Sequence, residues 1–113
     1  MFHLFKTGKG HVLKKINTEM GGGFSVKHTV KSSQAATMVL APGESTGGPD
    51  NKHKNSDQWL YVVSGNGEAV VNNENVSLKK GDLILIEAGD THEIKNSGKQ
   101  NLETLNFYSP PVY

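Results

Sequence analysis

GDLILIEAGDTHEIKN, residues 81–96, is the stretch of this sequence that decides the fold. It begins with a short apolar run, residues 83–86, between turn residues, which predicts a buried strand. A turn follows at residues 88–90, and His92, Ile94 and Asn96 then alternate with other residues. Side chains two residues apart lie on the same face of a strand, so these three point the same way. The stretch therefore predicts two strands, the second of which carries a histidine.

The other stretch that carries a histidine is NKHKNSDQWLYVVSG, residues 51–65. Residues 59–63 are apolar at every position, so one face of that strand looks into a core and the other needs a second sheet or a partner chain. Residues 64–67 contain two glycines and an asparagine, which indicates a hairpin. We expect His53 near the start of a strand, and a return strand carrying His92 would then place both imidazoles in one barrel.

The spacing within residues 81–96 resembles the second sequence motif of the cupin family. That motif is a glycine, five residues, Pro-x-Gly, two residues, a histidine, three residues and an asparagine. The positions that match it here are Gly81, Gly89, His92 and Asn96. Glu87 departs from the pattern, because it stands where proline is usual.

The first cupin motif is matched in part by residues 45–65. Gln58 keeps the family's six-residue gap to Gly65, so Gln58 stands where the family has a glutamate. Counting back from Gln58 places His53 at the second histidine of the motif and Asn51 at the first. This register therefore keeps one of the two histidines.

An alternative register of the first motif begins at Gly47. His53 is then the first histidine and Asn55 stands at the second, but the spacing to Gln58 is broken. His53 keeps its place in either register. The two registers differ in whether Asn51 or Asn55 accompanies it.

The resemblance implies an all-β fold, the double-stranded β-helix or jelly-roll barrel of the cupins, with residues 1–113 as a single cupin domain. In that domain the first motif spans about residues 45–65 and the second spans residues 81–96. The residue pattern agrees, because we count about nine short runs separated by Gly, Asn and Pro turns, a spacing typical of a sandwich or barrel. The 13 glycines in 113 residues also indicate many turns, and no segment has a convincing helical pattern.

In the cupin pattern three histidines and a glutamate hold a divalent metal ion, so the resemblance implies a metal site. The corresponding residues are His53, Gln58, His92 and Asn51, which supply two imidazoles and two amide oxygens. Such donors suit zinc, nickel, iron or manganese. Replacing the glutamate by an amide removes a Coulombic attraction and lowers the affinity. Some small cupins that act on uronate sugars are similar in having glutamine at this position.

A site without a metal is the alternative. His92 would then make hydrogen bonds inside the mouth of the barrel, with Gln58 and Asn51 as its partners, because buried polar groups need partners whether or not a metal is present. Asp57 neighbours Gln58 and is a weaker candidate for the site. Glu93 points away from His92 by strand parity, so we do not expect it to act as a general base.

Strand parity also divides the apolar residues between two faces. If Gln58 points inward, Trp59 and Tyr61 point outward, toward another sheet or a second subunit. The candidates for the core or the pocket wall are Met38, Leu60, Val62, Ile84, Ile94 and Phe107. The apolar run at residues 59–63 and the aromatic segment 107–113 predict a homodimer, because exposed apolar faces tend to find partners. Small cupins are similar in pairing through such strands.

Composition argues against several classes of protein. The chain has no cysteine, so it has neither disulfides nor a zinc–thiolate site. Its net charge of +1 gives no attraction to nucleic acid or to membranes, and all 12 basic residues are lysines, without the arginine fork that grips phosphates. No apolar run reaches the ~18 residues of a transmembrane helix, and no signal-peptide pattern is present, so we expect a cytoplasmic protein.

Three functions are compatible with these features. The first is a metal-dependent cupin enzyme that acts on a small organic molecule such as a sugar acid, as an isomerase, lyase or dioxygenase, with the metal as a Lewis acid. The second is a metal-free module that binds or senses a small molecule without catalysis. The third is a dimeric domain that acts with a larger partner. The site and not the fold decides among them.

Overall fold

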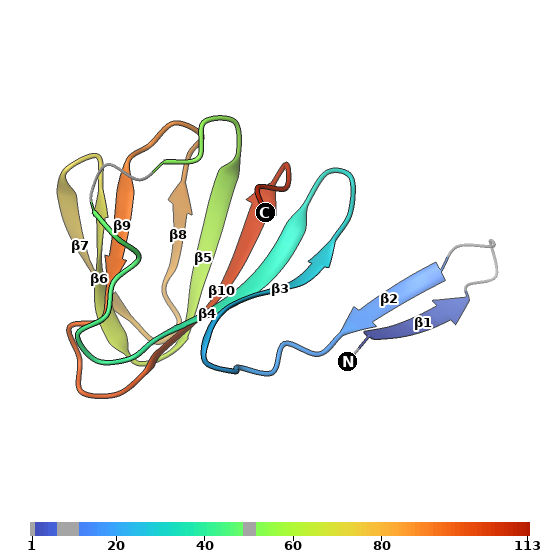
Figure 1. Ribbon diagram of the computed structural model, residues 1–113, viewed down its shortest axis with the longest axis horizontal. Helices are drawn as coiled ribbons and strands as arrows, with labels where there is room; N and C mark the ends of the chain where they lie inside the picture. The colour runs from blue at the N-terminus through green and yellow to red at the C-terminus, as the bar shows by residue number, and fades with distance from the viewer. Residues whose placement is uncertain (1, 7–11, 49–51) are drawn as a thin grey trace.

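The computed structural model describes residues 2–6, 12–48 and 52–113, and every regular element in these ranges is a β-strand (Figure 1). The strands are β1 (Phe2–Lys6), β2 (Val12–Ile16), β3 (Gly23–Thr29), β4 (Gln34–Leu40), β5 (Asp57–Ser64), β6 (Asn66–Val71), β7 (Glu74–Lys79), β8 (Leu83–Ile86), β9 (His92–Lys95) and β10 (Leu102–Ser109). All of their pairings are antiparallel. The described residues thus contain no helix that could cross a membrane, and the predicted all-β class is confirmed.

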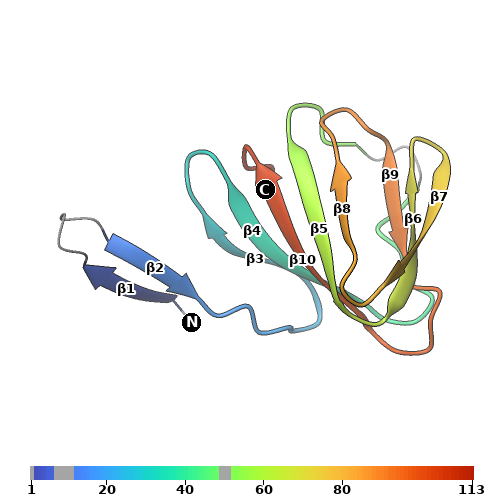
Figure 2. The same ribbon diagram turned by 180° about the vertical axis from the view of Figure 1, so that it is seen from behind.

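The strands form two facing sheets and a separate hairpin (Figures 1 and 2). The larger sheet has the order β3-β4-β10-β5-β8 and the smaller one the order β7-β6-β9. The consecutive strands β5 and β6 lie in different sheets, and so do β8 and β9. The chain therefore crosses repeatedly between the two layers and encloses the space between them. The β1–β2 hairpin projects away from this barrel.

Alternating burial along the strands places the core between the two sheets. On β5, Gln58, Leu60 and Val62 are buried, whereas Trp59 and Tyr61 between them are exposed. Burying an aliphatic side chain contributes about 1.5–3 kcal/mol, so a contiguous cluster of them holds the sheets together. The buried residues of this cluster come from both sheets and are Met38, Leu40, Leu60, Val62, Ala69, Leu78, Ile86, Ile94 and Leu102.

Strand β10 leads from this core to a polar region at the other end of the barrel. Its inward side chains are Leu102, Thr104, Asn106 and Tyr108, and none of them is more than 2% exposed. Leu102 belongs to the apolar cluster, whereas Tyr108 lies opposite Gln58 of β5. The same strand thus contributes to the core at one end and to a polar pocket at the other.

The strands predicted at residues 59–63, at residues 83–86 and from residue 92 are confirmed as β5, β8 and β9, and three other predictions are corrected. Phe107, predicted in the core, is 43% exposed, because it lies on the outward face of β10 opposite Trp59. His53 does not begin a strand, since it lies in the loop between an isolated bridge at Lys52 and the start of β5. Strand β9, which begins at His92, pairs with β6 and not with β5. The two histidines therefore approach each other across the barrel and not along one hairpin.

Gly65 connects β5 to β6 and explains the glycine that ends the first motif. Its φ of +91° lies in the left-handed region, which residues with a Cβ avoid. A Cβ at this position would overlap the backbone oxygen of Asn101 and lie 2.9 Å from Cα of Leu102. Both restrictions come from the backbone, so no side-chain rotation relieves them.

The outward face of the larger sheet is apolar, and we call it the outer apolar face. It consists of two rows of paired residues, Phe107, Trp59 and Leu85 in one row and Leu105, Tyr61 and Leu83 in the other. All of them except Leu105 are exposed. The outward orientation that parity predicted for Trp59 and Tyr61 is confirmed.

Candidate functional site

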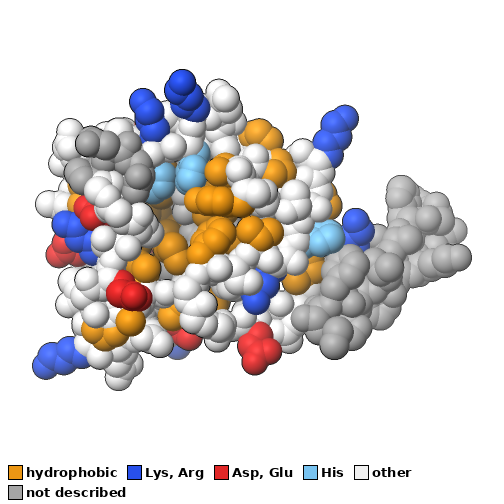
Figure 3. Space-filling model, viewed as in Figure 1, with side chains coloured by type: hydrophobic (Ala, Val, Ile, Leu, Met, Phe, Trp, Pro, Cys, Tyr) orange, Lys and Arg blue, Asp and Glu red, His pale blue; other side chains and the backbone are white. Residues whose placement is uncertain are grey.

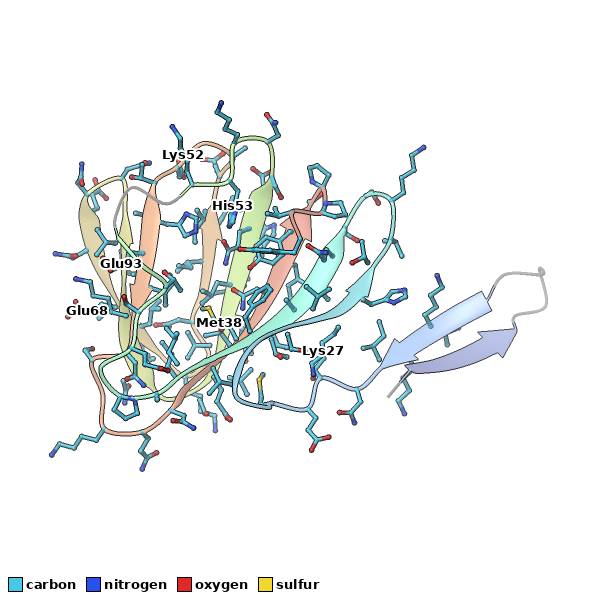
Figure 4. The ribbon with its side chains drawn as sticks, in the orientation of Figure 1. Lys27, Met38, Lys52, His53, Glu68 and Glu93 are labelled. Carbon is cyan, nitrogen blue, oxygen red and sulfur yellow. The ribbon has the colours of Figure 1, made fainter. Side chains whose placement is uncertain are left out.

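A cavity of about 270 Å³ opens at the polar end of the barrel. Its lining comes from both sheets, from the loop before β5 and from the segment after β10. It consists of Phe24, Met38, Thr46, Lys52, His53, Gln58, His92, Ile94, Tyr108 and Tyr113. Lys52 and His53 lie at the rim, and Met38 lies deeper between the sheets (Figure 4). Figure 3 shows histidine and apolar surfaces around the hollow. The volume is just below the range of about 300–1,000 Å³ that is typical of ligand pockets, so the cavity suits only a small molecule.

The structure brings His53 and His92 together in this cavity. Their ring centroids are 4.9 Å apart. Burial lowers the pKa of both imidazoles, and the proximity of His92 lowers the pKa of His53 further. At His92 a hydrogen bond to Asp90 and the charge of that residue partly oppose the effect of burial on the pKa. Both rings are therefore neutral at pH 7, and each keeps a free lone pair.

The contact between His92 and Asp90 determines which nitrogen of His92 carries the proton. Nδ1 of His92 lies 3.4 Å from the backbone oxygen of Asp90. A carbonyl oxygen only accepts hydrogen bonds, so Nδ1 carries the proton and Nε2 keeps the lone pair. Nε2 is then the nitrogen available to a metal ion or to a ligand that donates a hydrogen bond.

Gln58 supplies a third donor atom to the cavity. Its side chain is 3% exposed, and its Nε2 donates a hydrogen bond of 3.0 Å to Oδ1 of Asn106. Gln58 also lies near enough to His53 to oppose the lowering of that pKa, but Oε1 of Gln58 makes no well-formed hydrogen bond with any described residue. A buried acceptor without a partner costs about 1–3 kcal/mol, so this oxygen is ready to accept a cation or a ligand donor.

Three aromatic residues, Phe24, Tyr108 and Tyr113, form one side of the cavity, and we call them the aromatic wall. The ring centroid of Tyr113 lies 4.7 Å from that of Phe24, 5.2 Å from that of Tyr108 and 5.8 Å from that of His53. Burial raises the pKa of the Tyr108 hydroxyl, and the neighbouring Tyr113 adds to the increase. The Tyr108 hydroxyl therefore stays protonated and can donate a hydrogen bond.

Gln34 on β4 holds the segment that carries Tyr113. Its buried side chain accepts hydrogen bonds from the backbone nitrogens of Val112 and Tyr113, at 3.1 and 2.9 Å, through Oε1. Its Nε2 donates to the backbone oxygen of Tyr113 at 2.6 Å and to Oγ1 of Thr29 at 2.9 Å. One side chain thus satisfies three backbone groups beyond the two prolines at 110–111. The sequence predicts that the aromatic segment 107–113 contributes to a dimer contact. Tyr113 lies instead at the cavity and not on the outer apolar face.

The β8–β9 turn positions both histidines. The backbone nitrogen of Gly89 donates a hydrogen bond of 2.8 Å to the backbone oxygen of His53, and His92 begins the strand that follows. The turn is closed by hydrogen bonds of 2.9 Å from the backbone nitrogen of Glu87 to Oδ2 of Asp90 and from the nitrogen of Asp90 back to the oxygen of Glu87. A proline at position 87 has no N–H to donate, so this departure from the family motif adds a hydrogen bond to the turn.

The remaining predicted site residues have different outcomes. Asn51, predicted as a metal ligand, lies outside the described residues. Asn55, which replaces it in the alternative register, is exposed and does not line the cavity. Asp57 accepts a hydrogen bond of 2.8 Å from the backbone nitrogen of Ala88 through Oδ1, so it supports the β8–β9 turn and not the cavity. The register that pairs His53 with Asn55 therefore loses support.

The cavity has a lining without negative charge, as far as the described residues show. Glu93 is directed to Lys95, whose Nζ lies 3.7 Å from Oε1 of Glu93, and it does not line the cavity. Lys52 is the charged residue of the described lining. The residues that the structure describes also contain no cluster of three or more His, Cys, Asp and Glu side chains. A metal ion held by the donors described above would keep its full charge.

Sequence reasoning missed three residues that shape the site, Tyr108, Asn106 and Tyr113. Parity along the last strand could have indicated the first two, because they alternate with outward residues and face Gln58. Tyr113 has no comparable signal. Its position depends on contacts with Gln34, which is 79 residues away in the sequence.

Comparison with known proteins agrees with this architecture. Residues 36–108, more than half of the chain, match the cupin domain family. The chain is 35% identical over 75 residues to the oxalate-binding protein of Thermotoga maritima, an alignment that covers 66% of this chain and 60% of that protein. The crystal structure of BH2720 from Bacillus halodurans is similar with a TM-score of 0.77 and 26% identity, covering 81% of this chain and 73% of that one. A Klebsiella pneumoniae protein with a double-stranded beta-helix domain has a TM-score of 0.71 at 23% identity, covering 81% of both chains.

Two facing antiparallel sheets, closed into a barrel with a polar pocket at one end, define a double-stranded β-helix protein. The family match then shows that this chain belongs to the cupin family. The fold and the family implied by the two motifs are confirmed. The chain spans 60%, 48% and 49% of the length of the curated relatives that it matches.

Proposed function

We propose that this cupin holds a divalent metal ion between His53, His92 and Gln58 and acts on a small organic acid, such as a sugar acid, in the same cavity. The observation that carries the proposal is the convergence of two neutral imidazoles and a buried amide oxygen without a partner. Imidazole nitrogens and amide oxygens suit zinc, nickel, iron or manganese. Asn51 stays in the proposed ligand set on the sequence pattern alone.

The charges around the cavity support an acid as the ligand. The proposed metal ligands are all uncharged, so the positive charge of the ion would be left for the substrate to neutralise. Lys52 lies at the mouth, and the described lining contains no carboxylate to repel an anion. The name of the oxalate-binding relative is consistent with a small acid in this kind of barrel.

The residues of the cavity would have separate roles. The metal, when bound, would supply Lewis acidity that polarises a carbonyl or hydroxyl oxygen. Tyr108 keeps its proton and would donate a hydrogen bond to a substrate oxygen. Tyr113 and Phe24 would cover one side of the substrate and exclude water from it. This division of roles is compatible with an isomerase, a lyase or a dioxygenase, and we propose no single reaction.

Calorimetric titration of the untagged, metal-free protein with zinc, nickel and manganese tests the proposal. We expect His53→Ala and His92→Ala each to abolish binding, because a site with two imidazoles has no spare strong ligand. His28→Ala is the matched control, since His28 is half-buried on β3 and does not line the cavity. Unchanged titrations after removal of either cavity histidine would contradict the proposal.

A metal-free module that binds a small acid is the second candidate function. The polar set of the cavity favours it, because neutral imidazoles, the Tyr108 hydroxyl and the Gln58 oxygen can all make hydrogen bonds to a ligand directly. In that case the metal titrations show no binding, whereas glucuronate still raises the melting temperature of the protein in the presence of a chelator. Loss of the glucuronate effect on chelation would favour the metal-dependent function.

A further inference from the structure

A backbone carbonyl, that of Met38, determines which groups donate and which accept in the chain of hydrogen bonds that leads to Gln58. Oγ1 of Thr104 lies 3.1 Å from the backbone oxygen of Met38. That oxygen can only accept, so Thr104 donates its single hydroxyl proton to it. Toward Asn106, whose Nδ2 lies 3.0 Å away, the hydroxyl can then only accept. The side-chain amide of Asn106 is therefore oriented with its nitrogen toward Thr104.

The same reasoning extends to Gln58. With Nδ2 of Asn106 directed at Thr104, Oδ1 of Asn106 faces Gln58 and needs a donor. Nε2 of Gln58 supplies it at 3.0 Å, and Oε1 of Gln58 is left near His53 without a well-formed hydrogen bond. Thr104 and Asn106 are fully buried and Gln58 is 3% exposed. Reversing the Gln58 amide would bring two oxygens together away from water, where an unmet polar contact is costly.

We propose that Thr104 and Asn106 are positioning residues that hold the carbonyl oxygen of Gln58 toward the cavity. The site is thereby built for a neutral oxygen at position 58 and not for a carboxylate. Residue 58 must donate to Asn106, and an ionised carboxylate has no proton to donate, so a glutamate here would first have to take up a proton. The part of this inference that concerns a metal rests on the proposed function, whereas the orientation of Gln58 does not.

A double-mutant cycle on the metal-free protein tests the inference. Thr104→Val removes the hydroxyl at nearly constant shape and should lower the melting temperature, because Met38 and Asn106 lose a partner. Gln58→Glu should lower it too, because the new carboxylate faces an oxygen of Asn106. In the combined variant, Asn106 is released from position 104 and can turn its nitrogen toward the carboxylate. We therefore expect the decrease in melting temperature of the double variant to be smaller than the sum of the decreases of the two single variants.

Two further substitutions sharpen this cycle. Thr104→Ser keeps the hydroxyl, so the decrease in melting temperature that it causes should simply add to the decrease caused by Gln58→Glu. Asn106→Asp leaves no donor between positions 106 and 58 when both carboxyls are ionised. At a pH high enough to ionise both, the combined variant Asn106→Asp with Gln58→Glu should therefore lose more melting temperature than the sum of the two single losses. Additive losses in the Thr104→Val cycle, or the same coupling with Thr104→Ser, would overturn the inference. If Thr104→Val does not fold, the Asn106→Asp cycle decides alone, and additivity there overturns it.

Zinc titration of the same variants separates this inference from the proposed function. Thr104→Val should weaken zinc binding at least about twofold, because an amide free to reverse presents its oxygen for only part of the time. Adding Thr104→Val to Gln58→Glu should instead strengthen zinc binding relative to Gln58→Glu alone. If wild type and variants bind none of zinc, nickel and manganese, the proposed function fails, and the stability cycle still decides the orientation of Gln58.

Discussion

Burial makes His53 and His92 weaker bases in the folded chain than in the unfolded one. The pKa of both imidazoles lies below the unfolded value of 6.5. As the pH falls through 6.5 the unfolded chain takes up protons at these positions and the folded chain does not, so the free energy of unfolding decreases. We predict that the metal-free protein is less stable at about pH 5.5 than at about pH 7.5, measured by urea denaturation. This contribution is fully present above pH 6.5.

A double variant provides the control for that prediction. His53→Ala combined with His92→Ala removes both shifted groups and leaves the other titrating residues in place. Its free energy of unfolding should change less between the two pH values than that of wild type. Equal changes in the two proteins would assign the pH dependence to other residues.

The individual site residues were predictable where strand parity or motif spacing fixes them. His92 was found because it keeps its spacing to Gly89 and shares a face with Ile94. Gln58 was found from its distance to Gly65. The free oxygen of Gln58 was not predictable, because its orientation depends on Asn106, which is 48 residues away in the sequence and reaches it only through the fold.

At the scale of the elements, the connection between β5 and β6 tolerates no side chain at Gly65. We predict that Gly65→Ala destabilises the protein by about 2–6 kcal/mol, because the positive φ and the overlap with the backbone at residues 101–102 each cost about 1–3 kcal/mol. Gly22→Ala is the control, since no atom lies within 4 Å of a Cβ there and its φ is not positive. Chemical denaturation of both variants checks the prediction, and equal losses would contradict it.

The segment after β10 provides a second prediction at this scale. Gln34 holds this segment through backbone atoms of Val112 and Tyr113, so Tyr113→Ala should keep the segment in place while removing a ring from the aromatic wall. We predict that glucuronate then binds about two- to tenfold more weakly, since contact with an aromatic ring contributes about 0.5–1.5 kcal/mol. The melting temperature of the free protein should also fall, because the ring of Tyr113 packs against those of Phe24, Tyr108 and His53.

Tyr113→Phe is the matched control for that variant, because it keeps the ring and removes the hydroxyl. We expect it to bind glucuronate nearly as well as wild type. A loss as large as that of Tyr113→Ala would assign the effect to the hydroxyl and not to the wall.

The elements themselves were predicted better than their partners. Apolar runs and turn residues located the strands, because burial and turn chemistry act locally in the chain. The pairing of β9 with β6 was not predicted, since it depends on the crossing of the chain between two sheets. Phe107 was misplaced for a related reason: its parity becomes clear only when β10 is aligned with Trp59 on β5.

At the scale of the whole molecule, the outer apolar face is left largely uncovered by the residues that the structure describes, since five of its six side chains are exposed. Its two rows lie on the adjacent strands β8, β5 and β10, and all six side chains are uncharged. An apolar and uncharged surface can pack against its own copy, as a two-fold symmetric interface requires. We propose that a second copy of this chain covers it, so that the protein is a homodimer. The cavity with Tyr113 remains outside this contact.

We predict that sedimentation velocity at micromolar concentration shows a species of twice 12.2 kDa. Trp59→Lys should convert it to the monomer, because a charge at the centre of the face would have to be buried without a partner. Val76→Lys is the control: Val76 is 44% exposed and Trp59 is 43% exposed, but Val76 lies on β7 in the other sheet, so this variant should remain dimeric. A monomeric wild type would contradict the proposal, and dissociation by both substitutions would show that added charge and not the outer apolar face controls assembly.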